Sequence, residues 1–204
     1  MALQIENIDE LIQKIDAYLK TVVSEKRYNH SVRTAETAAF MCTLFNIPQK
    51  IGYLAGISHD MCKEFSAEDL FRLVEFDKKP ITTIEMQKPS LLHGRAAAVL
   101  LEQKFNVSDS DIKEAVANHT FAGANLCDLG KILFVADKIE PGRPQSTDEY
   151  RQNLFSKTLD ELTLSVLQEN IDYLEKRGKV VANVSYILRD QLLAAIGVNK
   201  NETK

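Results

Sequence analysis

"SVRTAETAAFMCTLF", residues 31–45, is the stretch of this sequence that decides the fold. Its apolar residues recur at spacings of three and four, as they do on one face of an α-helix. The pattern ends at Asn46 and Pro48, two residues that commonly terminate helices. The stretch therefore predicts a helix that packs one face against a core.

The segments on both sides of this stretch have the same helical period. Helices are expected over residues 8–23, over 66–76 with Ser66 and Asp69 in capping-box positions, over 108–119 with Ser110 or Ser108 as cap, and over 129–140 up to Pro141 and Gly142. Two longer helical patterns follow, roughly over residues 148–177 and 181–196. No segment alternates apolar and polar residues for long, and no hairpin dipeptide such as Asn-Gly occurs. The sequence predicts an all-α fold.

The segment 141–147, which contains proline and serine, is the best candidate for a joint in the chain. It separates an expected core, residues 1–144, from a C-terminal helical cap, residues 145–198, packed on the same unit. Residues 199–204 are expected to form a polar tail.

Composition is that of a soluble globular protein, with 45% hydrophobic and 26% charged residues among 204. No apolar run approaches the ~20 residues that a membrane span needs, and the first residues lack the basic and apolar blocks of a secretion signal. Three cysteines, an odd number, are expected to be reduced thiols in a cytoplasmic protein. A net charge of −4 gives no general attraction for nucleic acid.

The histidines are the informative feature of the chain. There are four, and they are His30, His59, His93 and His119. Helical spacing from His93 and His119 gives mostly alanine, valine, leucine and isoleucine, whereas from His59 it gives small residues that permit close helix approach. Asp137 likewise lies on an apolar face. We expect these side chains to point inward from separate helices, with Asp60 brought in by its neighbour His59.

Burial of several imidazoles and two carboxylates requires compensation, because unpaired buried polar and charged groups are strongly disfavoured. A metal ion supplies it, and nitrogen and carboxylate donors suit iron, manganese, cobalt, nickel or zinc. Six donors exceed what one ion with an open position needs, which favours two ions held by His30, His59, Asp60, His93, His119 and Asp137. Asp60 is the expected bridge, since its two oxygens can face different ions.

Each of these residues also has a simpler interpretation. A single inward histidine is usually a hydrogen-bonded core residue, but four of four histidines with two carboxylates favour a metal site. Lys63 follows the His-Asp pair by one turn, and it either shares their face or forms a solvated ion pair with Glu64 or Asp60. Arg143 either reaches back as a phosphate-binding group or lies at the surface.

Two further arginines flank His30 by one helical turn on each side. Arg27 and Arg33 are candidates for substrate contacts, and the alternative for both is surface ion pairing with Glu25 and Glu36.

Five short motifs occur in order along the chain, namely "YNHSVRTAETA" (28–38), "SHDMCKE" (58–64), "LLHGRAAA" (91–98), "ANHT" (117–120) and "FVADKIEPGR" (134–143). Their order resembles the HD-domain superfamily of metal-dependent phosphohydrolases. Within it, the chain is similar to the YqeK family of bacterial symmetrical diadenosine tetraphosphate hydrolases. The combination of "HDxxKE" with "ADxIEPGR" is the part most specific to that family. The resemblance runs from about residue 27 to 143 and implies an HD-domain helical bundle with additional C-terminal helices.

The resemblance implies a dinuclear centre of two divalent or trivalent ions, iron foremost, with manganese or cobalt as alternatives. The first ion would be held by His30, His59, Asp60 and Asp137, and the second by His93 and His119 with Asp60 bridging. It implies catalytic roles for Asp60, Lys63 and Arg143, the last two meeting substrate phosphates. The expected substrate-binding residues are Lys63, Arg27, Arg33, Thr120 and Arg143.

The implied activity is hydrolysis of diadenosine tetraphosphate to two ADP by metal-activated water. Other activities of the superfamily remain open at this point: a nucleotidase, a deoxynucleotide triphosphohydrolase or a cyclic dinucleotide phosphodiesterase, as does a non-catalytic metal-stabilised nucleotide-sensing module. The expected partner is a dinucleoside polyphosphate or another nucleotide, with no nucleic acid and no membrane, and a homodimer is left open. Aromatic residues available for an adenine pocket are Tyr28, Phe65, Phe121 and Tyr150, for each of which core packing is the alternative.

The chain departs from the family in the loop after the fourth histidine. Family members often have Thr-Thr-Gly there, whereas this chain has Thr120-Phe121-Ala122-Gly123. The details of the substrate loop are therefore expected to differ from the family pattern, while the metal ligands are not.

Overall fold

A computed structural model describes residues 8–202, and every regular element in that range is helical. The all-α prediction is confirmed. The α-helices are α1 (Ile8–Val22), α2 (Glu25–Leu44), α3 (Gln49–Ser58), α4 (Ala67–Val74), α5 (Thr83–Gln87), α6 (His93–Phe105), α7 (Ser110–Asn118), α8 (Asp128–Ile139), α9 (Asp148–Phe155), α10 (Leu159–Lys176) and α11 (Asn183–Glu202). Two short 3-10 helices are η1 (Glu75–Asp77) and η2 (Pro89–Leu92).

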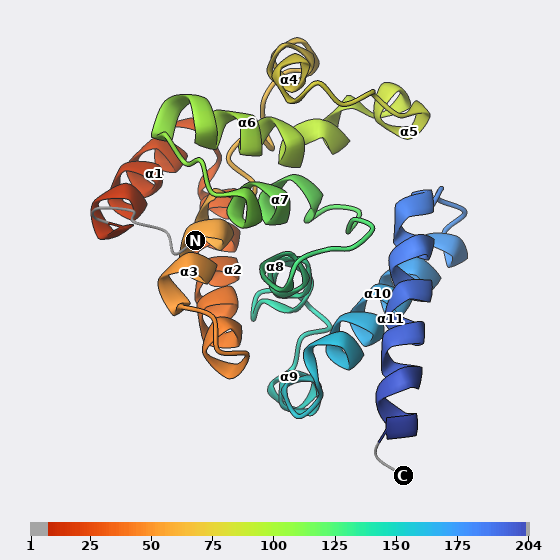
Figure 1. Ribbon diagram of the computed structural model, residues 1–204. Coiled ribbons are helices and arrows are strands. Elements are labelled where there is room, and N and C mark those ends of the chain that lie inside the picture. Colours follow the sequence, from red (N-terminus) through yellow and green to blue (C-terminus); the bar gives the residue numbers. More distant parts are fainter. Residues whose placement is uncertain (1–7, 203–204) are drawn as a thin grey trace.

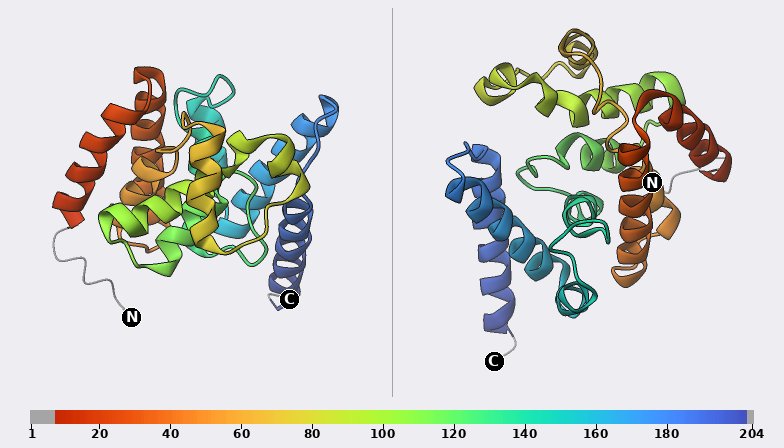
Figure 2. Two further views of the ribbon diagram at one scale, coloured as in Figure 1. Left: turned by 90° about the horizontal axis from the view of Figure 1, so that it is seen from above. Right: turned by 180° about the vertical axis from the view of Figure 1, so that it is seen from behind.

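The centre of the fold is built from α2, α3 and α8, which pack against one another (Figure 1). Helix α7 packs on α3 and α8, α6 packs on α7, and α4 lies outside α6. On another side of the centre, α10 packs against α8 and α11 packs against α10. The two further views in Figure 2 agree that α1 and the last helices lie on opposite sides of the molecule.

One continuous hydrophobic core runs through these layers. It includes residues from the first helix to the last, among them Ile15, Leu54, Phe134, Leu167 and Leu192. The expected division into residues 1–144 and 145–198 stays a prediction, because both segments contribute to this core. Helix α11 continues to Glu202 through most of the predicted tail, and residues 1–7 and 203–204 lie outside the described residues.

The three cysteines are free thiols. None of Cys42, Cys62 and Cys127 forms a disulfide. Cys42 and Cys62 are fully buried in the core, whereas Cys127 caps the first turn of α8 by accepting a hydrogen bond from the Gly130 amide. Among the described residues, no helix combines the length and the apolarity that crossing a membrane would require.

The predicted helix starts are partly confirmed. Ser66 caps α4 and accepts a hydrogen bond from the Asp69 amide, as predicted. The cap of α7 is neither Ser108 nor Ser110 but Asp109, whose carboxylate accepts from the Ile112 amide at 2.9 Å. Serine and aspartate cap helices about equally well, so a Ser-Asp-Ser run does not reveal which residue takes the position.

The long helical pattern predicted over residues 148–177 is wrong as a single helix. The chain breaks after α9, and α10 restarts at a capping box in which Thr158 and Glu161 bond each other's backbone amides. A threonine followed three residues later by glutamate is the sequence signal for such a start. Residues 77–92, for which the sequence predicts no helix, contain α5, η2 and the last residue of η1.

Two glycines of α3 allow it to lie against α2. A Cβ atom at Gly56 would come within 2.4 Å of the Ala35 Cα, and one at Gly52 within 2.7 Å of the Ala38 carbonyl oxygen. Both obstacles are backbone atoms, which cannot turn aside as a side chain can. The close approach predicted from the small residues before His59 is confirmed, and it brings the end of α3 to the middle of α2.

Replacing Gly56 by alanine is expected to lower the free energy of unfolding by about 1–3 kcal/mol, because α3 must move away from α2. Chemical denaturation in the presence of a chelator measures this free energy without a contribution from bound metal. Gly197, in α11, is the matched control, since a Cβ there meets no atom within 4 Å. Gly197→Ala is expected to leave stability unchanged or raise it by up to ~1 kcal/mol. If the two variants have equal denaturation midpoints, the close approach of α3 to α2 is contradicted.

Candidate metal centre

Five helices bring the predicted ligands together. His30 lies in the second turn of α2, and the His59-Asp60 pair directly follows α3. His93 begins α6, His119 directly follows α7, and Asp137 lies near the end of α8. All six side chains are buried, the most exposed being Asp137 at 9%. The inward orientation predicted for them is therefore observed.

The donor atoms form two groups that share one residue. In each group the donor atoms lie within 4.8 Å of one another, and the groups are His30, His59 and Asp60, and Asp60, His93 and His119. Asp60 Oδ2 lies 3.8 Å from His30 Nε2 and 3.6 Å from His59 Nε2. Its other oxygen, Oδ1, lies 3.0 Å from His93 Nε2 and 3.6 Å from His119 Nε2. The two oxygens of one carboxylate thus face different groups.

Asp137 joins the first of these groups. Its Oδ1 lies 3.0 Å from His30 Nε2 and 3.8 Å from His59 Nε2. The same oxygen accepts a hydrogen bond from Arg143 at 2.6 Å, and Oδ2 accepts one from Lys138 at 2.8 Å. The carboxylate is therefore held between two cationic side chains and the imidazoles.

Three of the histidines are held in the same way. His59, His93 and His119 each cap the end of a helix, α3, η2 and α7 respectively. In each, Nδ1 bonds the carbonyl oxygen three residues earlier, at 2.6 Å for His59 and 2.7 Å for the other two. A carbonyl oxygen only accepts, so Nδ1 carries the proton and Nε2 presents a lone pair to the site. The last carbonyls of a helix have no partner within the helix, and these imidazoles supply one.

His30 is held by a side chain instead. Its Nδ1 lies 3.1 Å from Glu140 Oε1. Glu140 is 2% exposed, and it also accepts hydrogen bonds from Arg33 at 2.5 Å and from the Gly142 amide at 2.6 Å. This carboxylate orients the imidazole so that its Nε2 faces Asp137 and Asp60, as carboxylates commonly do for metal-binding histidines.

Burial and charge fix the protonation of the centre. Burial lowers the pKa of His59 to about 3 and that of His93 to about 4, so both imidazoles are neutral at pH 7. Burial alone would raise the pKa of Asp60, but His59 and the other histidines around it hold that pKa well below its usual value. For Asp137 the same effect of burial is outweighed by Lys138, His30 and other neighbours, which keep its pKa well below the usual value.

These donors fit a metal ion. His93 Nε2 and His119 Nε2 lie 3.0 Å apart although both present lone pairs, and His59 Nε2 is buried with no hydrogen-bond partner. Acceptor atoms that converge at such distances repel one another unless a cation lies among them. Imidazole nitrogen and carboxylate oxygen suit divalent transition metals.

The remaining predicted residues lie at two edges of the centre. Lys63 Nζ lies 3.1 Å from His93 Nε2 and 4.0 Å from Asp60 Oδ1, and the Thr120 hydroxyl lies 3.3 Å from His93 Nε2. Arg143, whose NH2 group lies 3.4 Å from His30 Nε2, borders the other group. Both side chains are partly exposed, at 30% for Lys63 and 35% for Arg143, so they border the centre and also reach solvent, and the ion pair with Asp60 considered as the alternative for Lys63 is present.

Arg27 and Arg33 do not form the surface pairs considered for them. Arg27 donates to Asp60 Oδ2 at 2.6 Å, so it contacts the centre directly. Arg33 donates to Glu140 and thus reaches the centre only through that carboxylate and His30. Its predicted contact with substrate stays a prediction.

The loop after His119 shows what the departure from Thr-Thr-Gly means. Ala122, at the family's glycine position, has a φ of 59°, in the left-handed region that glycine adopts without strain. Thr120 keeps its place beside the imidazoles. Residue 122 thus has a backbone conformation that glycine adopts without strain, at the energetic cost that a Cβ atom brings there.

Sequence reasoning missed two features of the site. One is Glu140, which belongs to the motif "FVADKIEPGR" and whose position directly after an apolar helix face could have indicated its role. The other is a cavity of about 550 Å³ beside the centre, whose lining includes Asp137, Arg143 and the aromatic rings of Tyr150 and Tyr173. Tyr28, Phe65 and Tyr150 all pack against the core, and Tyr150 also lines this cavity.

Comparison with known proteins agrees with this geometry. Two curated relatives named symmetrical bis(5'-nucleosyl)-tetraphosphatase are similar over most of the chain. The one from Staphylococcus aureus is 28% identical over 84% of this chain and 89% of its own length. The one from Bacillus subtilis is 27% identical over 87% and 95% respectively.

A solved structure has the same fold. It is a protein from Clostridium acetobutylicum described as a predicted HD superfamily hydrolase involved in NAD metabolism. The TM-score is 0.82 at 26% identity, over 90% of this chain and 97% of that one. Residues 27–142, which include every predicted metal ligand, match the HD domain family. The protein belongs to the HD domain family.

Proposed function

We propose that this protein hydrolyses diadenosine tetraphosphate symmetrically, to two ADP, at a metal centre built around Asp60. The observation that carries the proposal is the pair of donor groups sharing Asp60, in a chain similar over most of its length to symmetrical tetraphosphatases. Water adds across the central anhydride, so its oxygen joins one inner phosphorus while the bridging oxygen leaves with the other ADP.

His30, His59, Asp60 and Asp137 would hold one ion, and Asp60, His93 and His119 a second. Such ions, when bound, lower the pKa of a coordinated water and neutralise phosphoryl charge. Two ions are our proposal for the number, and iron for the identity, with manganese or cobalt as alternatives. Asp60 stays ionised because its pKa is held well below its usual value, so it acts as a fixed negative charge.

Cationic groups at the two edges of the centre suit a polyphosphate chain that crosses it. Lys63 and the Thr120 hydroxyl lie beside His93, and Arg143 lies beside His30. Lys63 and Arg143 can stabilise charge that develops on the attacked phosphoryl group and on the leaving oxygen. Arg143 has five N–H donors, so it can keep its bond to Asp137 and still bind a phosphate. We assign Lys63, Thr120, Arg143 and Arg27 to substrate binding on this basis.

We further propose that the partner is a dinucleoside polyphosphate and that the protein acts in the cytoplasm. Formation of a homodimer and the contact of Arg33 with substrate are part of the same hypothesis.

Product analysis tests the proposed reaction. Metal-loaded protein incubated with diadenosine tetraphosphate is expected to release ADP as the sole nucleotide, at two equivalents per substrate consumed. Chromatography of the quenched reaction measures this. Release of AMP with ATP would show attack on an outer anhydride and contradict the symmetrical reaction. Deoxynucleoside triphosphates, mononucleotides and cyclic dinucleotides, assayed in parallel, measure the other activities of HD proteins.

Asp60→Asn is expected to lower turnover by at least ~10³-fold and to reduce bound metal, because both groups lose a shared anionic ligand. Elemental analysis of protein purified without added metal gives the stoichiometry, for which we expect two equivalents in the wild type. Circular dichroism checks that the helices remain. Asp190→Asn is the control, since Asp190 pairs with Arg189 on the exposed side of α11. Wild-type turnover in the Asp60 variant would refute the mechanism.

Glu140→Ala is expected to weaken metal binding by about 10–100-fold, because His30 loses the group that orients it. Glu140→Gln retains an acceptor for His30 Nδ1 and should lose less. Competition with a chelator of known affinity measures the effect independently of turnover. Glu102→Ala serves as the control, because Glu102 bonds only Lys113 among the contacts described and lies on the surface. If Glu140→Ala binds metal as tightly as Glu102→Ala does, Glu140 does not position His30.

A further inference from the structure

The cavity beside the metal centre continues away from it along α10. Its lining includes Asp137, Lys138 and Arg143, from α8 and the turn after it, and also Tyr150 of α9 and Tyr173 of α10. Its volume of about 550 Å³ lies within the range of sites that bind small molecules. Since Asp137 also lies 3.0 Å from His30 Nε2, the cavity and the centre share a wall.

One face of α10 forms the wall opposite the turn after α8. Val166, Glu169, Asn170 and Tyr173 all line the cavity, and their spacing of three, four and seven places them on a single helical face. Tyr173 is 50% exposed, and Arg177, one turn further, lies with its guanidinium carbon 4.6 Å from the centre of that ring. A half-exposed aromatic ring held by an arginine offers a surface on which a planar base can stack.

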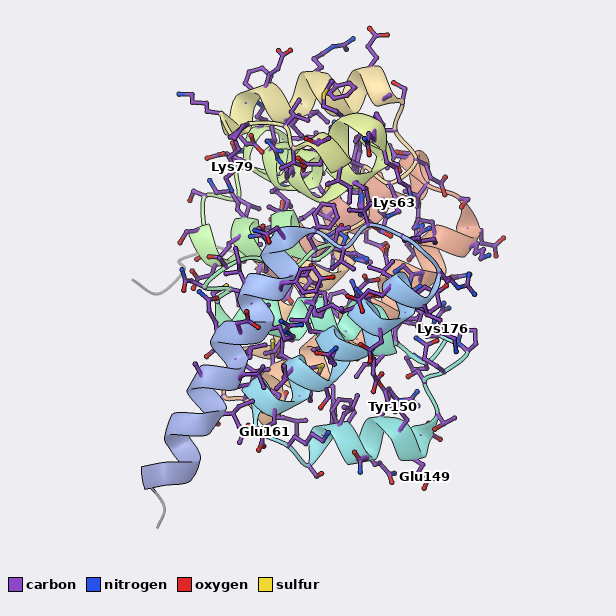
Figure 3. All side chains as sticks on the ribbon, turned by 90° about the vertical axis from the view of Figure 1, so that its right-hand side faces the viewer. Lys63, Lys79, Glu149, Tyr150, Glu161 and Lys176 are labelled. Carbon is purple, nitrogen blue, oxygen red and sulfur yellow. The ribbon has the colours of Figure 1, made fainter. Side chains whose placement is uncertain are left out.

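A hydrogen bond between helices fixes the position of this face. The Tyr150 hydroxyl, from α9, donates to Glu169 Oε2 of α10 at 2.5 Å. Figure 3 shows Tyr150 between α9 and α10, on the side of the molecule where the last helices lie. The aromatic and carboxylate groups are thus held in place before any ligand binds, which reduces the entropy lost on binding.

The charges that line the cavity define the kind of ligand. Lys138 and Arg143, next to the metal centre, favour phosphate. The carboxylate of Glu169 disfavours phosphate but can accept hydrogen bonds from ribose hydroxyls, and the Asn170 amide can both donate to and accept from a base edge. A ligand with phosphate at one end and an aromatic base at the other fits this lining, whereas inorganic polyphosphate would leave the aromatic and amide groups without a partner.

We infer that this cavity binds the nucleoside of one ADP half of the substrate, with the base against Tyr173 and the phosphates towards Arg143. The inference rests on the proposed function and adds to it a specificity site contributed by α10, outside the residues that match the HD domain family.

Tyr173→Ala tests the inference, because the residue is exposed and its truncation leaves the core intact. Loss of base stacking is expected to raise the KM for diadenosine tetraphosphate and the Kd for ADP about tenfold or more, with kcat and metal content within about twofold of wild type. Tyr173→Phe, which keeps the ring, is expected to behave as wild type. Phe76→Ala is the matched control, since Phe76 is 61% exposed and lies outside this cavity.

Calorimetric titration with inorganic tripolyphosphate separates nucleoside binding from phosphate binding. Tyr173→Ala should leave the affinity for tripolyphosphate unchanged and should lower the affinity for ADP. If the substitution lowers the affinity for both ligands equally, or for neither, the inference is overturned. If wild-type protein releases no ADP from the dinucleotide, the proposed function fails, but the titrations with ADP and tripolyphosphate still decide whether the cavity binds a nucleoside.

Discussion

The structure depends on three imidazoles that each cap a helix end. His59, His93 and His119 each donate Nδ1–H to the carbonyl oxygen three residues earlier, which satisfies a backbone group that a buried helix end would otherwise leave unpaired. The same hydrogen bond leaves Nε2 as a lone pair aimed into the centre. Helix ends must therefore converge on one point, and the glycines of α3 let that helix come close enough to α2 for His59 to approach His30. The same three imidazoles thus cap the helix ends and form the centre, so neither arrangement can change without the other.

The converging carboxylates and imidazole nitrogens repel one another, and arginine side chains reduce part of this repulsion. Each buried carboxylate near the centre has its own guanidinium partner: Asp60 bonds Arg27, Asp137 bonds Arg143, and Glu140 bonds Arg33. These pairs neutralise the acids. Lys63 and Arg143 also approach one imidazole nitrogen each, at 3.1 Å and 3.4 Å, but a side chain at the edge of the centre cannot lie among all four nitrogens. A compact divalent cation can, which is why the donor set fits a metal better than further hydrogen bonds would.

Much of this could be predicted from sequence, because helical period and the apolar neighbours of each histidine are local properties. The burial of His59, His93 and His119 follows from residues at most seven positions away. The cap of α7 could not be predicted, because Ser108, Asp109 and Ser110 are nearly equivalent as caps and only the final geometry selects one. Glu140 was missed for a different reason. Its partner His30 lies 110 residues earlier in the chain, and no spacing rule connects positions on α2 with the turn after α8.

The cavity shows the same limit and suggests how the chain divides its tasks. Val166, Glu169, Asn170 and Tyr173 have the spacing of a helical face, but the sequence does not show that this face meets the turn after α8. We propose that residues 1–144 hold the metal centre and that the cap, residues 145–198, selects the nucleotide. Under this division, changes on α10 alter substrate affinity without altering metal ligands, because no residue of α10 contributes a donor to either group. The shared core then has a functional reason, since a cap that binds one end of a substrate must be fixed rigidly relative to the centre that cleaves it.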